Sequence, residues 1–241
     1  MKRNWMKCSH EQYKNKHIDQ EALVLTCGPS FGETSFEKIK ELSKNKIVAT
    51  VKQTVQKVGD ISDYHFFNDN NFYNYETKAT KIASSGNYDW ARQFVWGSQD
   101  IDLFFKIKNA TSKIEDSLSY KKNFEDMLID NSLERPWGPG IMYETVIPFL
   151  IYMGIKNISI IGWDYTTKYD GTLDHYYDES RATKILKNTG NKIGTMVDLE
   201  KSVFLESTGP FYDFLRQKCG VEISLMSNCS ELSKKIKRIK I

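Results

Sequence analysis

Short apolar runs alternate with helical patterns through most of this chain, and this alternation limits the folds open to it. Continuous apolar runs of this length are typical of strands buried on both faces, as in parallel sheets. The predicted strands are Ala22–Cys27, Lys46–Val51, Tyr64–Asn68, Asp102–Ile107, Asn157–Ile161 and Val221–Met226. Helical patterns lie at residues 36–44, 112–128, 141–153 and 209–218. Strands alternating with helices predict an α/β fold, here a single Rossmann-like doubly wound and mainly parallel sheet.

The predicted elements fill one domain, which a chain of 241 residues is long enough to form. We expect this domain at residues 21–241, after a basic N-terminal extension at residues 1–20. Residues 68–87, rich in Asn and Tyr, are predicted to be a loop, and residues from about 165 to 200 a lid. The net charge is only +3, from 34 basic and 31 acidic residues, and does not indicate nucleic acid as a partner.

Four cysteines are scattered along the sequence, at Cys8, Cys27, Cys219 and Cys229. They form no CxxC pair, and their spacings fit no zinc site. Unpaired cysteines in a chain of this size are typical of a reducing compartment, so we expect a cytoplasmic protein. The basic N-terminal stretch has no apolar core behind it, so no signal peptide is expected.

The segment Leu232–Ile241 carries five basic residues interleaved with leucine and isoleucine. We expect a basic C-terminal helix here, with Ser230 as its N-cap. Such a helix could lie on an anionic membrane surface, at the inner face of the membrane. A solvated terminal helix explains the same pattern, and the sequence leaves both interpretations open.

Glycine and polar residues follow the predicted strands, where doubly wound sheets bind their ligands. They are Cys27, Gly28, Pro29 and Ser30; Lys52 and Gln53; Asn68, Asp69 and Asn70; and Gly162, Trp163, Asp164 and Tyr165. The turn at Gly28 suits either a phosphate contact or a plain strand-to-helix turn, because it matches neither GxGxxG nor a Walker loop. Asparagine pairs with bases and ribose but also forms turns. An aspartate after a strand holds a ribose or a metal, or caps a turn.

A polar segment rich in tyrosine, residues 169–178 (YDGTLDHYYD), follows Asp164 and is typical of a lid over a ligand. It contains His175, which is the only histidine in the second half of the chain. Histidine suits a general base near neutral pH. A surface histidine without a role is the alternative.

Taken together, four segments of the chain resemble the bacterial lipooligosaccharide sialyltransferases and the related hydroxymethylpterin pyrophosphokinase-like proteins. They are residues 21–33 (EALVLTCGPSFGE), 64–72 (YHFFNDNNF), 137–166 (WGPGIMYETVIPFLIYMGIKNISIIGWDYT) and 211–232 (FYDFLRQKCGVEISLMSNCSEL). The shared order is a GPS turn, an Asn after a middle strand, an (S/G)xG-initiated helix, a strand ending in G-x-D, and a final strand, Ser and helix. The resemblance spans roughly Glu21–Ile236, and the order and spacing of the motifs carry it.

The resemblance implies a CMP site across the strand ends, with no metal and no further cofactor required. The implied nucleotide-binding residues are Cys27, Gly28, Pro29, Ser30, Lys52, Gln53, Asn68, Gly138, Gly140, Asp164 and Tyr165. The sialyltransferases hold the leaving phosphate with tyrosines near and beyond this aspartate, which implies such a role for Tyr165, Tyr169, Tyr176 or Tyr177.

The chain departs from the family pattern at two places. Lys52 stands where the sialyltransferases carry an Asn, and a matching Gln53 follows it. In the family, the catalytic histidine lies shortly before the helix that matches residues 209–218. The corresponding stretch here, residues 201–210, contains no histidine. The general base is then His175 or Glu206. We predict His175, because the other histidines lie before the first strand or within a strand.

The sequence therefore supports a glycosyltransferase that moves a sialic acid-like or Kdo-like sugar from a CMP-activated donor. Its expected partners are the nucleotide sugar and a glycan or lipid-linked glycan acceptor; a homo-oligomer stays open. One alternative is a pyrophosphokinase-like enzyme that uses ATP and Mg²⁺, with Asp164 and either Asp69 or Asp170 as metal ligands. The other is a non-catalytic nucleotide-binding or scaffold protein.

Overall fold

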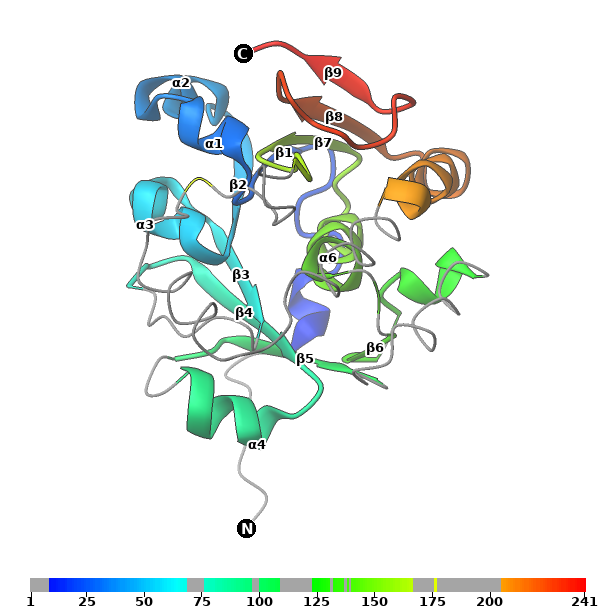
Figure 1. The fold of residues 1–241 in the computed structure, drawn as a ribbon. Helices are drawn as coiled ribbons and strands as arrows, with labels where there is room; N and C mark the ends of the chain where they lie inside the picture. Colours follow the sequence, from blue (N-terminus) through cyan, green and yellow to red (C-terminus); the bar gives the residue numbers. More distant parts are fainter. Residues whose placement is uncertain are drawn as a thin grey trace, which may run out of the picture.

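The structure is a computed structural model that describes residues 9–68, 76–96, 100–108, 123–130, 132–136, 138, 140–166, 176 and 205–241. Within these residues the chain forms one open sheet of nine strands, in the order β6-β5-β4-β3-β2-β1-β7-β8-β9 (Figure 1). All neighbouring strands in this sheet run parallel. The predicted α/β class with a mainly parallel sheet is confirmed.

Six of the nine described strands follow the predicted apolar runs of the sequence, and β4, β6 and β9 do not. They are β1 (Glu21–Leu25), β2 (Lys46–Val51), β3 (Tyr64–Asn68), β4 (Thr80–Ser85), β5 (Leu103–Ile107), β6 (Glu134–Arg135), β7 (Asn157–Ile161), β8 (Glu222–Met226) and β9 (Lys237–Ile239). Three of them, β2, β3 and β7, coincide with the predicted runs, and β1, β5 and β8 differ by one or two residues at their ends.

The strand order reverses its direction between β1 and β7. β1 pairs with β2 on one side, Glu21 opposite Lys46, and with β7 on the other, Glu21 opposite Asn157. Successive strands build outward from this pair toward both edges of the sheet. In open α/β sheets, ligands bind beyond the carboxyl ends of the strands at such a switch point.

Short helices connect the strands. They are η1 (His10–Tyr13), α1 (Pro29–Glu33), α2 (Phe36–Leu42), η2 (Lys52–Thr54), α3 (Val55–Val58), η3 (Gly59–Ile61), α4 (Tyr88–Ala91), η4 (Arg92–Trp96), η6 (Phe124–Met127), η7 (Met142–Val146), α6 (Ile147–Tyr152) and η8 (Leu215–Cys219), which continues a helix at residues 205–214. The helical pattern at residues 36–44 is confirmed as α2, and the Ser35 side chain caps this helix by accepting a hydrogen bond from the Lys38 N–H at 3.2 Å. The helical patterns at residues 141–153 and 209–218 are also confirmed.

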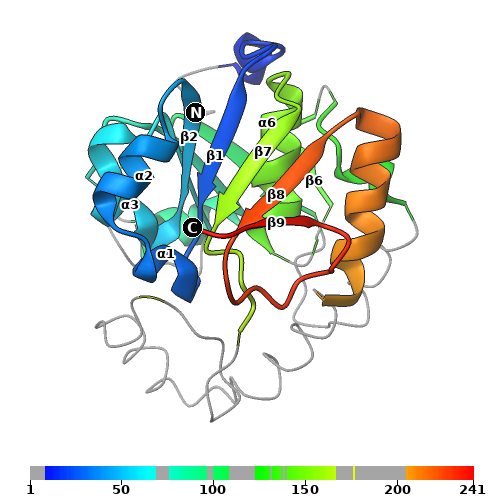
Figure 2. The same ribbon diagram turned by 90° about the horizontal axis from the view of Figure 1, so that it is seen from above.

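Both faces of the sheet are covered by helices (Figure 2). On β1, Ala22 and Val24 belong to the larger apolar cluster, which includes α6 and the helix at residues 205–219. Leu23 and Leu25 belong to the second cluster, on the side of α1 and α2. Because successive side chains of a strand point to opposite faces, a strand covered on both sides needs a continuous apolar run, as the sequence has here.

The predicted basic C-terminal helix is wrong. Residues 237–239 form the edge strand β9, which pairs with β8, and residues 230–236 form an irregular turn. Leu232 and Ile236 are each 1% exposed and belong to the main core. The apolar residues that suggested membrane contact therefore pack inside the domain. In the part of the chain that the structure describes, no helix combines the length and apolar character that a membrane crossing requires.

Two other boundaries also need correction. The stretch 68–87, predicted to be a loop, contains β4, whose residues Ile82, Ala83, Ser84 and Ser85 are all buried. The domain begins before residue 21, where the sequence placed its start, because Tyr13 is 4% exposed and packs in the main core. The predicted helix at residues 112–128 lies largely outside the described residues.

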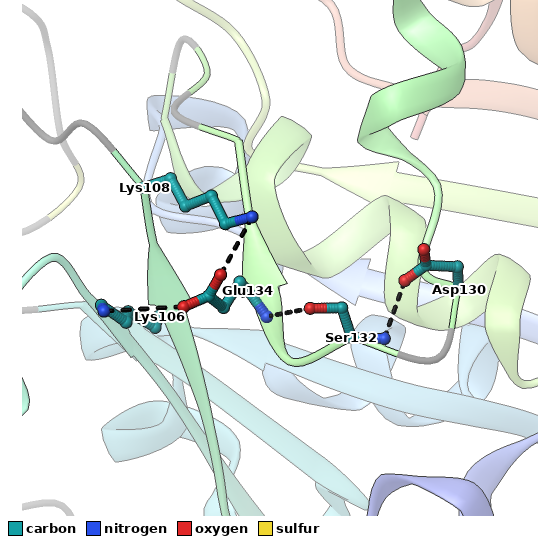
Figure 3. A network of polar contacts seen from close by, with 5 residues as sticks. All are labelled: Lys106, Lys108, Asp130, Ser132 and Glu134. Carbon is teal, nitrogen blue, oxygen red and sulfur yellow. Dashed lines mark hydrogen bonds and ion pairs between the residues drawn. The ribbon is translucent and has the colours of Figure 1, made fainter.

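The far edge of the sheet is protected by charged side chains (Figure 3). Glu134 of β6 pairs with Lys108 at 2.9 Å and with Lys106 at 3.6 Å, and Lys108 lowers the pKa of Glu134. Asp130 and Ser132 accept backbone hydrogen bonds in the turn that leads into β6. Charged residues on an edge strand discourage pairing with other chains.

Candidate functional site

A buried carboxylate, that of Asp164, joins the turns that follow β1, β7 and β8. Ser30 donates to it twice, from its N–H to Oδ2 at 2.8 Å and from its hydroxyl to Oδ1 at 2.9 Å. The hydroxyl of Ser227 donates to Oδ1 at 2.6 Å. These three residues, named the strand-end hub from here on, are 1% to 3% exposed. A buried carboxylate needs such donors to replace its lost hydration.

The turns after β1 and β7 approach so closely that glycine is required. The Gly28 N–H donates to the Gly162 carbonyl at 2.8 Å, and a Cβ added at Gly28 would lie 2.3 Å from the same oxygen. The Gly162 N–H in turn donates to the Ser30 hydroxyl at 2.9 Å. The structure thus brings Gly28, Ser30 and Asp164 together at the switch point. Their contact with a nucleotide stays a prediction.

The first helix of this region, α1, begins at Pro29 and is held at its end by Lys57. The Lys57 ammonium donates to the carbonyls of Phe31, Gly32 and Thr34 at 3.0 to 3.4 Å. Partial burial lowers the pKa of Lys57. A cation at a helix C-terminus satisfies carbonyls that have no partner within the helix, so it fixes the position of α1 beside the hub.

Tyr176 bridges the ends of β1 and β2. Its N–H donates to the Cys27 carbonyl at 3.0 Å, and its hydroxyl donates to the Gln53 carbonyl at 2.7 Å. Its ring packs edge-on against Phe31, with 4.9 Å between the ring centroids. The structure therefore directs this hydroxyl to the protein backbone. The implied role of Tyr176 toward a leaving phosphate stays a prediction.

Two non-glycine residues at these strand ends have left-handed backbone angles. Lys52, directly after β2, has a φ of 56°, and Tyr165, directly after Asp164, has a φ of 53°. L-amino acids rarely adopt this region without a compensating constraint, and such strain concentrates at functional sites. Asn15, Asp19 and Asn45 also have positive φ, but asparagine and aspartate tolerate this region more readily than lysine or tyrosine.

Asn68 and Gly140 also lie at the carboxyl edge of the sheet. Asn68 ends β3, which is two strands and therefore about 10 Å from β1. Its carbonyl accepts a hydrogen bond from the Trp96 indole at 3.3 Å. Gly140, with a φ of 100°, precedes the helix that returns the chain to the start of β7. The structure places both residues at the predicted edge.

Two buried charged side chains hold the turn before η7. The Gly138 N–H donates to the Glu144 carboxylate at 3.1 Å. The Arg135 guanidinium donates to the carbonyls of Met127, Leu128 and Glu144. Burial lowers the pKa of Arg135 to about 10. Arg135 and Glu144 were not among the predicted site residues, because nothing in the sequence distinguishes a buried charge from a solvated one.

Only one of the two candidate bases falls within the described residues. Glu206 is exposed at the start of the helix at residues 205–214. Two residues further on, Thr208 is buried and shares a hydrogen bond of 2.5 Å with the Tyr143 hydroxyl. His175 and Tyr177 lie outside the described residues, as do Tyr169, Asp69 and Asp170.

Four buried polar atoms near the ends of β1 and β7 and in η7 have no hydrogen-bond partner within the described residues: Thr26 Oγ1, Thr145 Oγ1, Trp163 Nε1 and Thr166 Oγ1. The Trp163 ring packs against the Tyr143 ring, 5.7 Å between centroids. An unpaired buried polar atom costs about 1–3 kcal/mol, so proteins normally give it a water or ligand partner. Because each of these atoms is almost fully buried, a ligand or water would have to enter between the strand ends to pair with it. No metal-binding group of three His, Cys, Asp or Glu occurs among the described residues.

The described residues define an open parallel α/β fold with a polar site at its topological switch point. No protein-family model matches the chain, and no curated protein matches it. Among solved structures, the chain is similar to the sialyltransferase CstII from Campylobacter jejuni, in complex with a substrate analogue, CMP-3FNeuAc. The two chains are 14% identical, with a TM-score of 0.42, over 92% of this chain and 89% of that one. The fold class rests on the sheet topology described above.

Proposed function

We propose that this chain is a glycosyltransferase that moves a sialic acid-like or Kdo-like sugar from a CMP-activated donor to a surface-glycan acceptor. One observation carries the proposal: the Gly28 turn meets the G-x-D end of β7 at the switch point of the sheet. This arrangement agrees with the motif order shared with the lipooligosaccharide sialyltransferases. The unpaired polar atoms of Thr26, Thr145 and Trp163 and the strained Lys52 at the same edge support it.

In the proposed reaction, a general base removes the proton of an acceptor hydroxyl, whose oxygen attacks the anomeric carbon of the donor sugar. The bond between that carbon and the CMP phosphate oxygen breaks, and CMP leaves with the electron pair. Donors at the strand ends stabilise the charge on the departing phosphate. We assign the base to His175, with Glu206 as the rival. Lys52 offers a cation to a carboxylate or phosphate of the donor.

Ligand-dependent thermal stability tests the substrate class directly. A ligand that binds the folded protein raises its melting temperature as its concentration exceeds the dissociation constant. We expect CMP to raise the melting temperature without Mg²⁺ and ATP to leave it unchanged. Stabilisation by ATP only in the presence of Mg²⁺ would favour the pyrophosphokinase-like alternative. No shift with either nucleotide contradicts the assignment of a nucleotide-binding protein.

Two matched variants test the base. A positioned base contributes about 10²–10⁴-fold to the rate, so His175→Ala should lower turnover of a CMP-sugar by that factor. The affinity for CMP should stay nearly unchanged, because the base acts on the acceptor. Glu206→Gln is the matched control and should retain turnover. The opposite result would assign the base to Glu206, and full turnover in both variants would contradict the mechanism.

The nucleotide position has its own test at the end of β3. If the Asn68 amide pairs with the nucleotide in a site shielded from water, Asn68→Ala should weaken CMP binding by about 1–3 kcal/mol. Asn87→Ala is the control. Asn87 caps α4 through a hydrogen bond to the Trp90 N–H, so its loss should affect local stability and leave CMP affinity unchanged.

A further inference from the structure

The turn after β8 makes several polar contacts with the candidate site. The Ser227 hydroxyl donates to Asp164 Oδ1 at 2.6 Å and accepts from the N–H groups of Cys229 at 3.2 Å and Ser230 at 3.0 Å. A hydroxyl has one proton and two lone pairs, so these contacts use its full capacity. Ser227 is 3% exposed, and water therefore has little access to this oxygen.

Two further bonds fasten the same turn to the end of β7. The Glu231 N–H donates to the Asp164 carbonyl at 2.7 Å, and the Ser230 hydroxyl donates to the Trp163 carbonyl at 3.0 Å. The turn at residues 227–231 thus holds both the backbone and the side chain of Asp164. Leu232, the next residue, is buried in the main core and anchors the far side of the turn.

Asp164 transmits this constraint to the turn that the proposed function assigns to the nucleotide. One of its oxygens accepts the Ser30 N–H, and the other accepts both the Ser30 and the Ser227 hydroxyls. The position of the carboxylate therefore fixes the backbone of Ser30, two residues after the Gly28 N–H that donates to Gly162. Without Ser227, one oxygen of the carboxylate would keep only the Ser30 hydroxyl.

We propose that Ser227 is a positioning residue for the nucleotide-binding turn at residues 28–30, acting through Asp164. This proposal rests on the proposed function as far as the ligand is concerned. It adds a residue of the C-terminal segment to the site, although Ser227 itself need not touch the ligand. The same geometry makes the backbone of the turn sensitive to Ser227 whether or not a nucleotide is bound.

Two measurements on the full chain test the proposal, well below the melting temperature so that every variant is folded. The variants are Ser227→Ala, which removes the hydroxyl, Ser227→Thr, which keeps it, and the control Ile223→Val. Ile223 lies on the same strand, β8, is 1% exposed and belongs to the core, and the hydrogen bonds of the hub do not involve it. The control therefore destabilises the fold without altering the hub.

The first measurement is amide hydrogen exchange of Gly28, Ser30 and Phe31, which needs no ligand. We expect Ser227→Ala to raise exchange at the Ser30 amide about tenfold or more, and Ile223→Val to change it little. The second is the dissociation constant for CMP by calorimetry. It should rise about tenfold in Ser227→Ala and stay within about twofold of the original in Ser227→Thr and Ile223→Val.

The outcomes separate this proposal from the proposed function. Faster exchange at Ser30 in a protein that does not bind CMP supports the positioning role and contradicts the CMP assignment. Unchanged exchange and unchanged affinity in Ser227→Ala overturn the positioning role. If Ile223→Val raised the exchange rate and the dissociation constant as much as Ser227→Ala, the effect of Ser227 would be one of general stability. That result would also overturn the positioning role. If Ser227→Ala does not fold, Ser227→Cys, which replaces the hydroxyl with a weak thiol donor, is measured in its place under the same criteria.

Discussion

Replacing Asp164 with asparagine keeps the shape of the side chain but leaves it one acceptor where the carboxylate had two. In one orientation, the amide nitrogen faces the Ser30 N–H, and two donors oppose each other. In the other, the nitrogen faces the hydroxyls of Ser30 and Ser227. The Ser227 oxygen already accepts from the N–H groups of Cys229 and Ser230 and has no lone pair left. Both orientations leave a buried donor unpaired.

The magnitude follows from these bonds. An unpaired buried donor costs about 1–3 kcal/mol, and each of the two remaining bonds loses about 1 kcal/mol when its acceptor is no longer charged. We therefore expect Asp164→Asn to lower the free energy of unfolding by about 3–5 kcal/mol. Small domains are stable by only about 5–15 kcal/mol, so this change should be large relative to the total.

Urea unfolding at neutral pH, followed by tryptophan fluorescence and extrapolated linearly, measures this difference. Asp213→Asn is the control. Asp213 pairs with Lys235 at the surface, and both side chains are solvent-accessible, so the loss should stay below about 1 kcal/mol. A loss in Asp164→Asn no greater than in the control would refute the account of the hub as a network of fully used hydrogen bonds.

Three further predictions concern the fold around the site. Gly28→Ala should lower the free energy of unfolding by about 1–3 kcal/mol because its Cβ would overlap the Gly162 carbonyl. Gly59→Ala, whose Cβ would find its neighbours no closer than 3.8 Å, is the control for that urea experiment. Leu232→Ala should lower the free energy of unfolding by about 2–5 kcal/mol in the same assay, because the side chain is buried. A change near zero would indicate that the C-terminal segment is solvated instead of packed in the core. His65 is fully buried, and burial lowers its pKa to about 3, so the unfolded chain binds a proton that the folded one does not. That contribution is complete above the ordinary pKa of 6.5 and is lost as the pH falls toward 3. The free energy of unfolding should therefore be about 2 kcal/mol lower at about pH 5 than at pH 7, as measured by unfolding curves at the two pH values. If His65→Gln showed the same pH dependence as the original protein, the assignment to His65 would be wrong.

Much of the fold could be predicted because strands covered on both faces have a simple sequence pattern. The runs at β2, β3 and β7 carry apolar side chains at most of their buried positions, and burial on both sides of the sheet favours this. β4 was not predicted because its sequence, TKIASS, is mostly small or polar. Ser84 and Ser85 are nevertheless buried, with exposed fractions of only 1% and 2%. The Ser85 hydroxyl donates to the Asn87 carbonyl at 3.1 Å, whereas the Ser84 hydroxyl has no partner among the described residues, so the sequence pattern of β4 does not indicate that these side chains are buried.

The C-terminal segment shows why a pattern can mislead. Leu232 and Ile236 are four residues apart, which is helical spacing, and basic residues surround them. The structure buries both side chains from an irregular turn and then adds β9 to the sheet. Pairing with β8 satisfies the backbone groups of β9 and so overrides the local preference for a helix.

The candidate site was predictable where one turn supplies its chemistry, as at Gly28 and Ser30. It was not predictable where distant segments meet. Ser227 bonds to a residue 63 positions away in the sequence. The role of Arg135 depends on the folded structure, in which its buried guanidinium donates to the carbonyls of Met127 and Leu128. Such partners are set by the packing of the whole sheet.

The central position of β1 has a consequence for how the protein folds. β1 can pair with β2 after a short connection, but its pairing with β7, Glu21 opposite Asn157, requires a long stretch of chain to close first. The entropy lost in closing a loop grows with its length, and folds rich in such non-local pairs fold slowly. The turns after β1, β7 and β8 cannot meet before these strands have assembled. We therefore expect the strand-end hub to form late, so that a folding intermediate holding only β1 to β3 would have native-like strands and no hub.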